Sequence, residues 1–426
     1  MTIKGVFRLS LGFGLCCTAA VSQAEDWPTF RGANRAAVSA ETGLLDSWSE
    51  SGPRLVWEAK GSGRGYASPA VADGKVFTLG DHLSTADDTD EYLTCFSASD
   101  GKQLWKTKTG PAYSEHNKES WNGSRSTPTV DGDLVYVISP FGKLVCAKVS
   151  DGSVAWEKNL KQDFGGKKKD SWGYGESPLV DGDLLLCTPG GEQATVIALD
   201  KKSGELVWKC SRPTDVGAGH SSIVISQVGG RKVYVQNTGG GPMGIAENGE
   251  LLWTYDMAPP TAFIPTPIIK DDLVFSVAGY NLGGALLQQV PSRDGVNIKE
   301  VYGLKKEVAN KHGGVIRVGD YLYGSNEDRN TVYCAELTSG EVKWRERGAG
   351  EGSTSVIAGD GKLFVRFQNG TVALAKLSPD AYEEISSFKT PGSGENNKPS
   401  WAHPVIANGQ LLLREGDSIL CYDISK

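Results

Sequence analysis

The sequence predicts an all-β fold, an eight-bladed β-propeller built from four-stranded antiparallel blades. Three observations lead to this fold class. A turn that ends in tryptophan recurs about every 48 residues, close to the repeat length of known propellers. Short apolar segments joined by Asp-Gly or Asn-Gly recur at a similar spacing. Glycine is abundant, at 54 of 426 residues, as expected for a chain with many tight turns.

The tryptophan repeat places the outermost strand of each blade. Residues 100–105 have the pattern Asp-Gly-x-x-x-Trp, and residues 203–208 and 339–344 carry Ser-Gly in the same turn. A large flat side chain at the same point of every blade packs between neighbouring blades. Two steps of the repeat, near Lys299 and near Phe388, lack the tryptophan. We assign this structural role to Trp57, Trp105, Trp156, Trp208, Trp253 and Trp344.

A hairpin signal marks the two inner strands of each blade. In residues 70–77, Asp73-Gly74 separates two short apolar segments, and residues 405–411 carry Asn408-Gly409 in the same place. These turns need positive φ, so the pattern is typical of a tight β-hairpin. Further copies of the hairpin signal lie at residues 129–136, 179–184, 268–274 and 357–363, and weaker copies lie at 223–235 and 315–322. With the copies at 70–77 and 405–411, these signals predict eight blades.

The two ends of the chain are expected to share one blade. The last hairpin, at residues 405–411, is followed by one further strand around Cys421 and by no fourth strand. Residues 55–60 have the character of a fourth strand without a blade of their own. We predict that they complete the last blade, so that residues 25–426 form one propeller with a lead-in at 25–54. Such closure removes free sheet edges.

Residues 1–24 have the pattern of a cleaved signal peptide. Lys4 and Arg8 precede an apolar stretch of about 13 residues, and small residues precede a cleavage position after Ala24. We therefore expect a periplasmic or secreted protein, and the apolar stretch is too short for a membrane span. The net charge of −7 argues against a nucleic-acid partner, which normally requires a basic surface. We expect a monomer.

Cysteines and two charged segments are interpreted as structural. Residues at equivalent positions of different repeats lie far apart, so we predict buried thiols rather than disulfides. The five acids between Asp81 and Glu91 lack the spacing of a calcium-binding loop, and we expect them, like the lysines at 167–169, to be solvated. The six cysteines concerned are Cys95, Cys146, Cys187, Cys210, Cys334 and Cys421.

Several motifs resemble those of PQQ-like β-propeller repeat proteins, in the quinoprotein alcohol dehydrogenase-like superfamily. Residues 198–208, with Ala-Leu-Asp, Ser-Gly-Glu and a final Trp, are similar to that superfamily's tryptophan-docking motif, and residues 334–344 follow the same pattern. Asp-Trp-Pro-Thr-Phe-Arg-Gly at 26–32 and Gly-Tyr-Ala-Ser-Pro at 65–69 resemble exported members of planctomycete-type bacteria. The resemblance covers nearly the whole chain after residue 24. It implies the fold, and members include both dehydrogenases and a non-enzymatic lipoprotein that assists outer-membrane β-barrel assembly.

The central funnel of the propeller is the expected place for a ligand. The loops that lead into the innermost strand of each blade, called axial loops below, are rich in glycine, aromatic residues and histidine. Glycine lets backbone approach a ligand, and the rings supply stacking and hydrogen bonds. The alternative to a ligand site is a central channel that these side chains simply fill. The ligand-binding candidates are Tyr66, Trp121, Asn122, Arg125, Trp172, Tyr174, Glu176, His220, His312, Trp401 and His403.

The resemblance also implies a cofactor site. In the dehydrogenases, PQQ lies between a Trp and a disulfide of adjacent cysteines, and Ca²⁺ is held by carboxylate and amide oxygens. By that resemblance Trp172 or Trp401 would supply the stacking surface, Glu176 and Asn122 the oxygen ligands, and Arg125 a partner for a quinone carboxylate. However, the chain after residue 24 has no adjacent cysteines, no haem-attachment motif and no catalytic signature such as G-x-S-x-G.

We therefore expect an exported, non-catalytic binding or scaffold protein without cofactor or metal, with a ligand or partner at the funnel. The partner would be an envelope protein, a peptide or a glycan. The alternative is a dehydrogenase of alcohols or sugars that depends on PQQ and calcium. A third hypothesis is a hydrolase or lyase that uses the funnel His and Glu. A three-histidine metal site is not expected, because the histidines come from blades spread around the ring.

Overall fold

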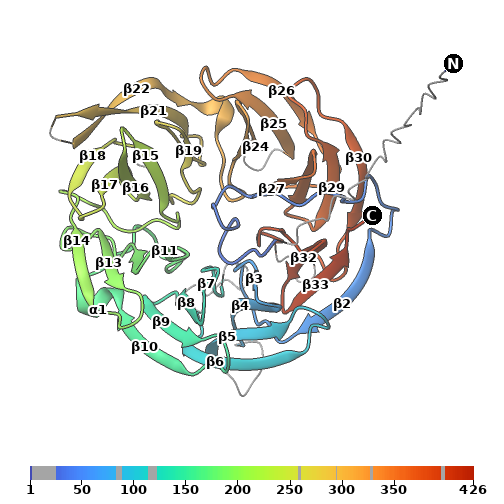
Figure 1. Cartoon of the computed structure of the whole chain (residues 1–426), viewed down its shortest axis with the longest axis horizontal. Coiled ribbons are helices and arrows are strands. Elements are labelled where there is room, and N and C mark those ends of the chain that lie inside the picture. The colour runs from blue at the N-terminus through green and yellow to red at the C-terminus, as the bar shows by residue number, and fades with distance from the viewer. Residues whose placement is uncertain are drawn as a thin grey trace.

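The computed structural model describes Met1 and residues 25–82, 89–113, 122–257, 261–293, 295–326, 330–394 and 399–426. Eight sheets stand in a closed ring around a central axis (Figure 1), which confirms the predicted eight-bladed β-propeller. Helix within these ranges is limited to α1 (Leu160–Phe164) and a 3₁₀ turn at Lys306–Val308. The expected signal peptide falls outside the described residues, apart from Met1. No helix in the described part of the chain is long and apolar enough to span a bilayer.

The first four blades follow one another along the chain, each running from its inner strand to its outer strand. Blade 1 contains β3 (Ala70–Ala72), β4 (Lys75–Asp81), β5 (Asp90–Ser97) and β6 (Gln103–Pro111). Blade 2 contains β7 (Thr129–Asp131), β8 (Leu134–Ile138), β9 (Lys143–Lys148) and β10 (Val154–Asn159). Blade 3 contains β11 (Leu179–Asp181), β12 (Leu184–Cys187), β13 (Val196–Asp200) and β14 (Leu206–Cys210). Blade 4 contains β15 (Val224–Val228), β16 (Arg231–Thr238), β17 (Gly241–Ala246) and β18 (Leu251–Thr254).

The next three blades keep this order, and blade 7 gains a fifth strand. Blade 5 contains β19 (Ile268–Lys270), β20 (Leu273–Ala278), β21 (Gly283–Ser292) and β22 (Gly295–Lys305). Blade 6 contains β23 (Ile316–Val318), β24 (Tyr321–Ser325), β25 (Thr331–Glu336) and β26 (Val342–Arg347). Blade 7 contains β27 (Thr354–Gly359), β28 (Lys362–Phe367), β29 (Thr371–Lys376) and β30 (Glu384–Lys389), and β1 (Val38–Ser39) pairs in parallel with β27.

Blade 8 is made from both ends of the chain. Three of its strands are β31 (Val405–Ala407), β32 (Gln410–Glu415) and β33 (Ser418–Asp423), and the fourth is β2 (Arg54–Lys60). β2 pairs antiparallel with β33, from Arg54 opposite Asp423 to Lys60 opposite Ser418. The predicted closure by the N-terminal strand is therefore confirmed, and the strand begins one residue before the expected segment 55–60.

The inner hairpins show why Asp-Gly and Asn-Gly recur. Asp73 and Gly74 have φ values of 49° and 67°, and Asn408 and Gly409 have values of 56° and 71°. Two successive residues with positive φ are typical of a type I′ turn, whose twist matches that of the two strands it joins. The turn residues thus fix the register in which each short inner strand pairs with its neighbour.

The repeat tryptophans connect neighbouring blades. The ring of Trp57 lies against Gly101 of blade 1, where a Cβ atom would come within 2.6 Å of the ring, so only glycine fits. The Trp57 indole N–H also donates to the Ala98 carbonyl at 2.9 Å. The same ring-on-glycine contact joins Trp105 to Gly152, Trp156 to Gly204 and Trp208 to Gly249, and the indole N–H groups of Trp105, Trp156 and Trp344 donate to carbonyls of the next blade.

Phe388 takes the tryptophan position at one of the two steps that lack it. A Cβ atom on Gly52 would come within 2.6 Å of the Phe388 ring, so this ring lies on Gly52 as the indoles lie on their glycines. Gly52 precedes β2 in the turn that leads into blade 8. The interblade contact is therefore kept with a smaller ring. The cysteine prediction is also confirmed, since all six cysteines after residue 24 are free and buried.

The lead-in crosses the centre of the ring before it reaches β1. In Figure 1 it is the dark blue trace in the middle of the ring. Trp27 pairs with Val71 of β3, and the Arg35 guanidinium donates to the carbonyls of Ser177 and Ile223, each at 3.0 Å. Arg35 therefore ties the axis to the axial loops just before the innermost strands of blades 3 and 4, and the lead-in fills part of the channel.

Deleting residues 25–60 would remove β2 together with the lead-in. We expect the truncated protein to lose the cooperative thermal transition of the full chain, because β33 becomes an unpaired edge and the Trp57 contact is lost. Circular dichroism at increasing temperature measures this. The control is Trp105→Ala, which removes one interblade ring and should lower stability by about 3 kcal/mol while leaving one cooperative transition. An unchanged melting transition in the truncated protein would refute the closure.

Candidate functional site

The axial loops and the lead-in enclose a cavity of about 290 Å³ at the centre of the ring, called the central cavity below. Loops from every blade except blade 7 contribute to its wall. The lining is mostly aromatic and cationic rather than aliphatic. It consists of Phe30, Arg31, Tyr66, Arg125, Trp172, Gly175, His220, Ile264, Pro265, Thr266, Tyr280, Lys311, His312, Gly314, Trp401 and His403.

Aromatic rings from three blades form one side of the central cavity. The His312 imidazole lies over the Trp401 indole, with ring centroids 4.1 Å apart and planes inclined by 30°. The Tyr66 ring contacts the same indole at a centroid distance of 5.2 Å. The Trp401 indole N–H donates to the Gln368 side-chain oxygen at 3.0 Å, which fixes the ring orientation. The arrangement offers a rigid aromatic surface, which suits the flat or apolar face of a ligand.

Arg31 comes from the lead-in rather than from a blade. Its Nη2 donates to the Val315 carbonyl at 2.7 Å and its Nε donates to the Arg35 carbonyl at 3.1 Å. Its Nη1 has no hydrogen-bond partner within the described ranges, although the residue is only 4% exposed. Burial lowers the pKa of Arg31 to about 10, so the guanidinium remains charged at neutral pH. The cavity wall therefore holds a buried cation that none of the described carboxylates pairs with.

A second polar group is built around Asp170, which lies behind His220 of the wall. The Asp170 carboxylate lies 3.1 Å from Nε2 of His220 and 4.0 Å from the Lys168 ammonium. Burial opposes ionisation of Asp170, but the neighbouring His220 and Lys168 bring its pKa below the ordinary value. Burial lowers the pKa of His220, followed by the charge of Lys168, so the imidazole is neutral at neutral pH. With Nε2–H donating to Asp170, Nδ1 is left as an acceptor.

The position of Lys168 corrects one expectation. The lysines at 167–169 were expected to be solvated, yet the Lys168 side chain is only 7% exposed. Its ammonium donates to the Gly219 carbonyl at 2.5 Å and is drawn inward by Asp170. Burial lowers the pKa of Lys168 to about 8. Lys167 alone of the three is exposed.

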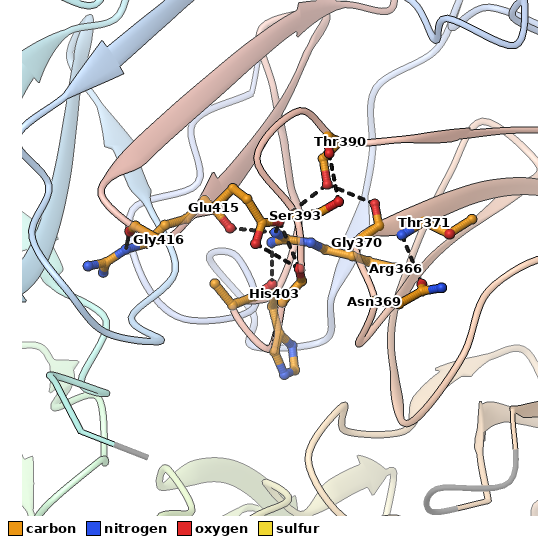
Figure 2. Close-up of polar contacts among 12 residues, drawn as sticks. Arg366, Asn369, Gly370, Thr371, Thr390, Ser393, His403, Glu415 and Gly416 are labelled. Carbon is orange, nitrogen blue, oxygen red and sulfur yellow. Dashed lines mark hydrogen bonds and ion pairs between the residues drawn. The ribbon is translucent and has the colours of Figure 1, made fainter. Parts of the chain in front are cut away.

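His403 is held with its imidazole facing the central cavity. Nε2 lies 3.3 Å from the His312 carbonyl, which can only accept, so Nε2 carries the proton and Nδ1 is an acceptor. Burial, followed by the charge of Arg31, lowers the pKa of His403 to about 3. The preceding residue is anchored by the buried ion pair between Arg366 and Glu415 (2.8 Å), because Arg366 also donates to the Ala402 carbonyl. Figure 2 shows the His403 side chain pointing away from that pair.

Seven of the eleven sequence-predicted funnel residues line the central cavity, as the lining given above shows. Trp121 lies outside the described residues, and Asn122 is not part of the wall. Tyr174 is buried between blades 2 and 3 and donates to the Pro189 carbonyl at 2.8 Å. Phe30, Arg31, Tyr280 and Lys311 also line the central cavity but were not predicted from the sequence. The signal for the first two was the Asp-Trp-Pro-Thr-Phe-Arg-Gly segment, whose path across the axis cannot be inferred from local pattern.

Glu176 lies behind the cavity wall, and its contacts do not match the calcium ligand that the resemblance implied. It accepts hydrogen bonds from the Thr188 backbone N–H at 2.7 Å and from the Thr188 hydroxyl at 2.9 Å. The Gln236 amide donates to it at 3.1 Å. Burial raises the pKa of Glu176 to about 8. These contacts link the axial loop of blade 3 to blade 4.

Two acids of the segment 81–91 are buried, contrary to the expected solvated loop. Asp81 accepts from the Arg64 guanidinium at 2.6 Å, and the Glu91 carboxyl accepts from the hydroxyls of Thr109 at 2.7 Å and Ser124 at 2.5 Å. Burial raises the pKa of Glu91 to about 8. These carboxyl groups connect strands within and beside blade 1. The residues between them, 83–88, lie outside the described ranges.

The sequence profile of the family described as outer membrane protein assembly factor BamB, a PQQ-like repeat family, matches residues 89–346. The chain belongs to this PQQ-like repeat family. No curated protein matches the chain significantly.

Solved structures of PQQ-like propellers resemble the whole ring. BamB from Moraxella catarrhalis is 14% identical, with a TM-score of 0.58 over 87% of this chain and 97% of that one. The quinohemoprotein alcohol dehydrogenase from Comamonas testosteroni is 12% identical, with a TM-score of 0.62 over 94% and 81% of the two chains. The dehydrogenase ADHIIG from Pseudomonas putida HK5 is 13% identical, with a TM-score of 0.60 over 94% and 80%. At these identities the likeness shows the fold.

The lining of this PQQ-like propeller suits an anion better than Ca²⁺. Calcium takes six to eight oxygen ligands, usually including carboxylates. Among the described lining residues, side-chain oxygen comes from Tyr66, Thr266 and Tyr280, and none is a carboxylate or an amide. No group of three metal-ligating side chains occurs in the part of the chain that the structure describes. The cations Arg31 and Arg125 would suit the carboxylates of PQQ, but the calcium that accompanies it in the dehydrogenases does not fit this donor set.

The Glu176→Gln variant should show a weaker dependence of stability on pH. The folded-state pKa of Glu176, about 8, lies above the ordinary value of 4.5. Between pH 4.5 and about 8, folding is therefore coupled to uptake of a proton by this carboxyl group. This contribution to stability is complete below pH 4.5 and is lost as the pH rises through about 8. Glutamine carries no titrating proton. Chemical denaturation between pH 5 and 9 measures the difference.

The matched control for this prediction is Glu250→Gln, which changes an exposed glutamate of blade 4. It should leave the pH dependence of the wild type unaltered. If Glu176→Gln also retains the full wild-type slope, the carboxyl group does not hold a proton in the folded protein.

Proposed function

We propose that this PQQ-like propeller is an exported, non-catalytic binding protein whose central cavity receives a ligand or a protruding group of a larger partner. One observation carries the proposal. Axial loops from seven blades and a segment from outside the blades converge on a single cavity with an aromatic and cationic wall. Its volume of about 290 Å³ is near the lower end of small-molecule sites, about 300 Å³. Such a cavity accommodates a small molecule or one exposed unit of a larger one.

The expected partners follow from this size and from the expected location. The segment 1–24 supports export to the periplasm or the outside, where envelope proteins, peptides and glycans occur. A folded domain cannot enter the central cavity, so a protein partner would insert a side chain or a chain end. The family description, which names an outer membrane assembly factor, supports a role in binding rather than catalysis.

The competing function is a dehydrogenase of alcohols or sugars that depends on PQQ and calcium. Its support is the structural likeness to the quinohemoprotein dehydrogenases. Against it stand the donor set of the lining and the contacts of Glu176, which is engaged by Thr188 and Gln236. The chain after residue 24 also lacks adjacent cysteines.

We expect PQQ with Ca²⁺ to leave the melting temperature of the purified full chain unchanged relative to PQQ alone. We also expect no reduction of an artificial electron-acceptor dye when alcohols or sugars are added. Differential scanning fluorimetry and dye absorbance measure the two results, and a known quinoprotein dehydrogenase serves as the positive control. Stoichiometric, Ca²⁺-dependent binding of PQQ together with dye reduction would replace the binding function by the dehydrogenase function.

A further inference from the structure

We propose that the central cavity binds a sugar acid, with its carboxylate at Arg31 and two of its hydroxyl groups at His220 and His403. This inference rests on the proposed binding function and names the class of ligand. Three polar side-chain atoms in the cavity wall carry it. They are Nη1 of Arg31, Nδ1 of His220 and Nδ1 of His403, and each is buried without a hydrogen-bond partner within the described ranges.

Such atoms destabilise the folded protein unless a ligand supplies the missing hydrogen-bond partner. A buried polar atom without a partner destabilises a protein by roughly 1–3 kcal/mol, and a charged one by more. In this protein the second nitrogen of each imidazole is engaged, by Asp170 for His220 and by the His312 carbonyl for His403. The Arg31 guanidinium is likewise bonded through Nε and Nη2. These hydrogen bonds fix the three side chains, and one nitrogen of each remains without a hydrogen-bond partner in the described part of the chain.

Glycines lie beside two of these atoms. A Cβ atom on Gly175 would lie 2.6 Å from Nδ1 of His220, and a Cβ atom on Gly314 would lie 2.3 Å from Nη1 of Arg31. Both glycines line the central cavity. A side chain at either position would collide with the unpartnered nitrogen, so only glycine leaves these nitrogens undisturbed at the edge of the cavity.

The chemistry of the three atoms selects the functional groups of the ligand. The Arg31 guanidinium is a charged donor and favours a carboxylate, with Arg125 and Lys311 adding positive charge to the wall. Nδ1 of His220 and Nδ1 of His403 are acceptors, so each requires an O–H or N–H donor from the ligand. One anionic group and at least two donors are therefore needed in one compact molecule.

The aromatic surface selects the framework that carries these groups. Tyr66 and the stacked pair of His312 and Trp401 present rings to the cavity. The C–H faces of a sugar ring pack on such surfaces while its hydroxyls point outward to polar partners. A simple aromatic acid has the flat face and the anion but lacks the two donors. A hexuronic acid supplies all three features.

The test measures binding of D-glucuronate and D-galacturonate to the purified full chain by isothermal titration calorimetry. Two neutral probes, D-glucuronamide and D-glucose, keep the ring and the hydroxyls but remove the charge. We expect both neutral probes to bind at least about tenfold more weakly, since hydrogen bonds to a charged group are the stronger ones. Benzoate keeps the anion and a flat ring without the hydroxyls, and it should also bind at least about tenfold more weakly.

The matched protein variants are Gly175→Ala and Gly110→Ala. The backbone of neither glycine has positive φ, so alanine imposes no backbone strain at either position, and only at Gly175 does its methyl group meet a neighbour closer than 3 Å. Gly175→Ala places a methyl group against Nδ1 of His220 and should weaken uronate binding at least about tenfold. Gly110 lies in β6 away from the cavity lining, and a Cβ atom there meets nothing closer than 3.9 Å, so Gly110→Ala should bind as the wild type does.

A digalacturonate probe distinguishes the two sources of the sugar acid. Binding at least as tight as that of the monosaccharide indicates the end of a glycan chain, and binding of the monosaccharide alone indicates the free acid; both results support the inference. Equal binding of glucuronate, glucose and benzoate, or no binding of either uronate, overturns it. The proposed function would survive if another small molecule binds the wild type and not Gly175→Ala, so the two failures are distinguishable.

Discussion

The pairing of β2 with β33 is the constraint on which the rest of the structure depends. Because β2 covers the edge of β33, the last blade has four strands like the others, and every blade packs against two neighbours. Closure also determines the path of the segment before β2. Residues 25–37 lie at the axis, and the chain returns along β27 before it enters blade 8. The central cavity therefore acquires side chains that no blade supplies.

The fold was predictable because its determinants are local and repeated. An Asp-Gly turn and an indole four residues after a glycine act within one hairpin, so Gly101 with Trp105 can be recognised without any knowledge of the tertiary structure. The indole contact itself joins adjacent blades, as Trp57 on Gly101 shows, but it recurs with the sequence period. Even Phe388, which breaks the tryptophan pattern, keeps the same contact on Gly52, although Gly52 lies just before β2 and no turn joins β2 to β33.

The candidate site could be predicted only in part, because its geometry depends on contacts between distant segments. The axial loops were identifiable by composition, yet neighbouring residues within them point in different directions. Gly175 lines the central cavity, whereas Tyr174 and Glu176 on either side of it are buried in blade contacts. Lys168 became buried because Asp170 and the Gly219 carbonyl lie inward of it. Arg31 reaches the cavity through Val315, more than half the chain away.

The symmetry of the ring explains why the lead-in matters for the proposed ligand site. Eight similar blades present similar backbone ends to the axis, and a symmetric cavity has no preferred orientation for an asymmetric ligand. The lead-in crosses this axis once and places the Arg31 guanidinium in the cavity wall on one side of it. A buried cation without a carboxylate is disfavoured in an empty cavity and is compensated when an anion binds. Arg31, from outside the repeats, thus adds a buried cation on one side of the cavity to the charges of Arg125 and Lys311, while the repeats supply the rigid aromatic wall.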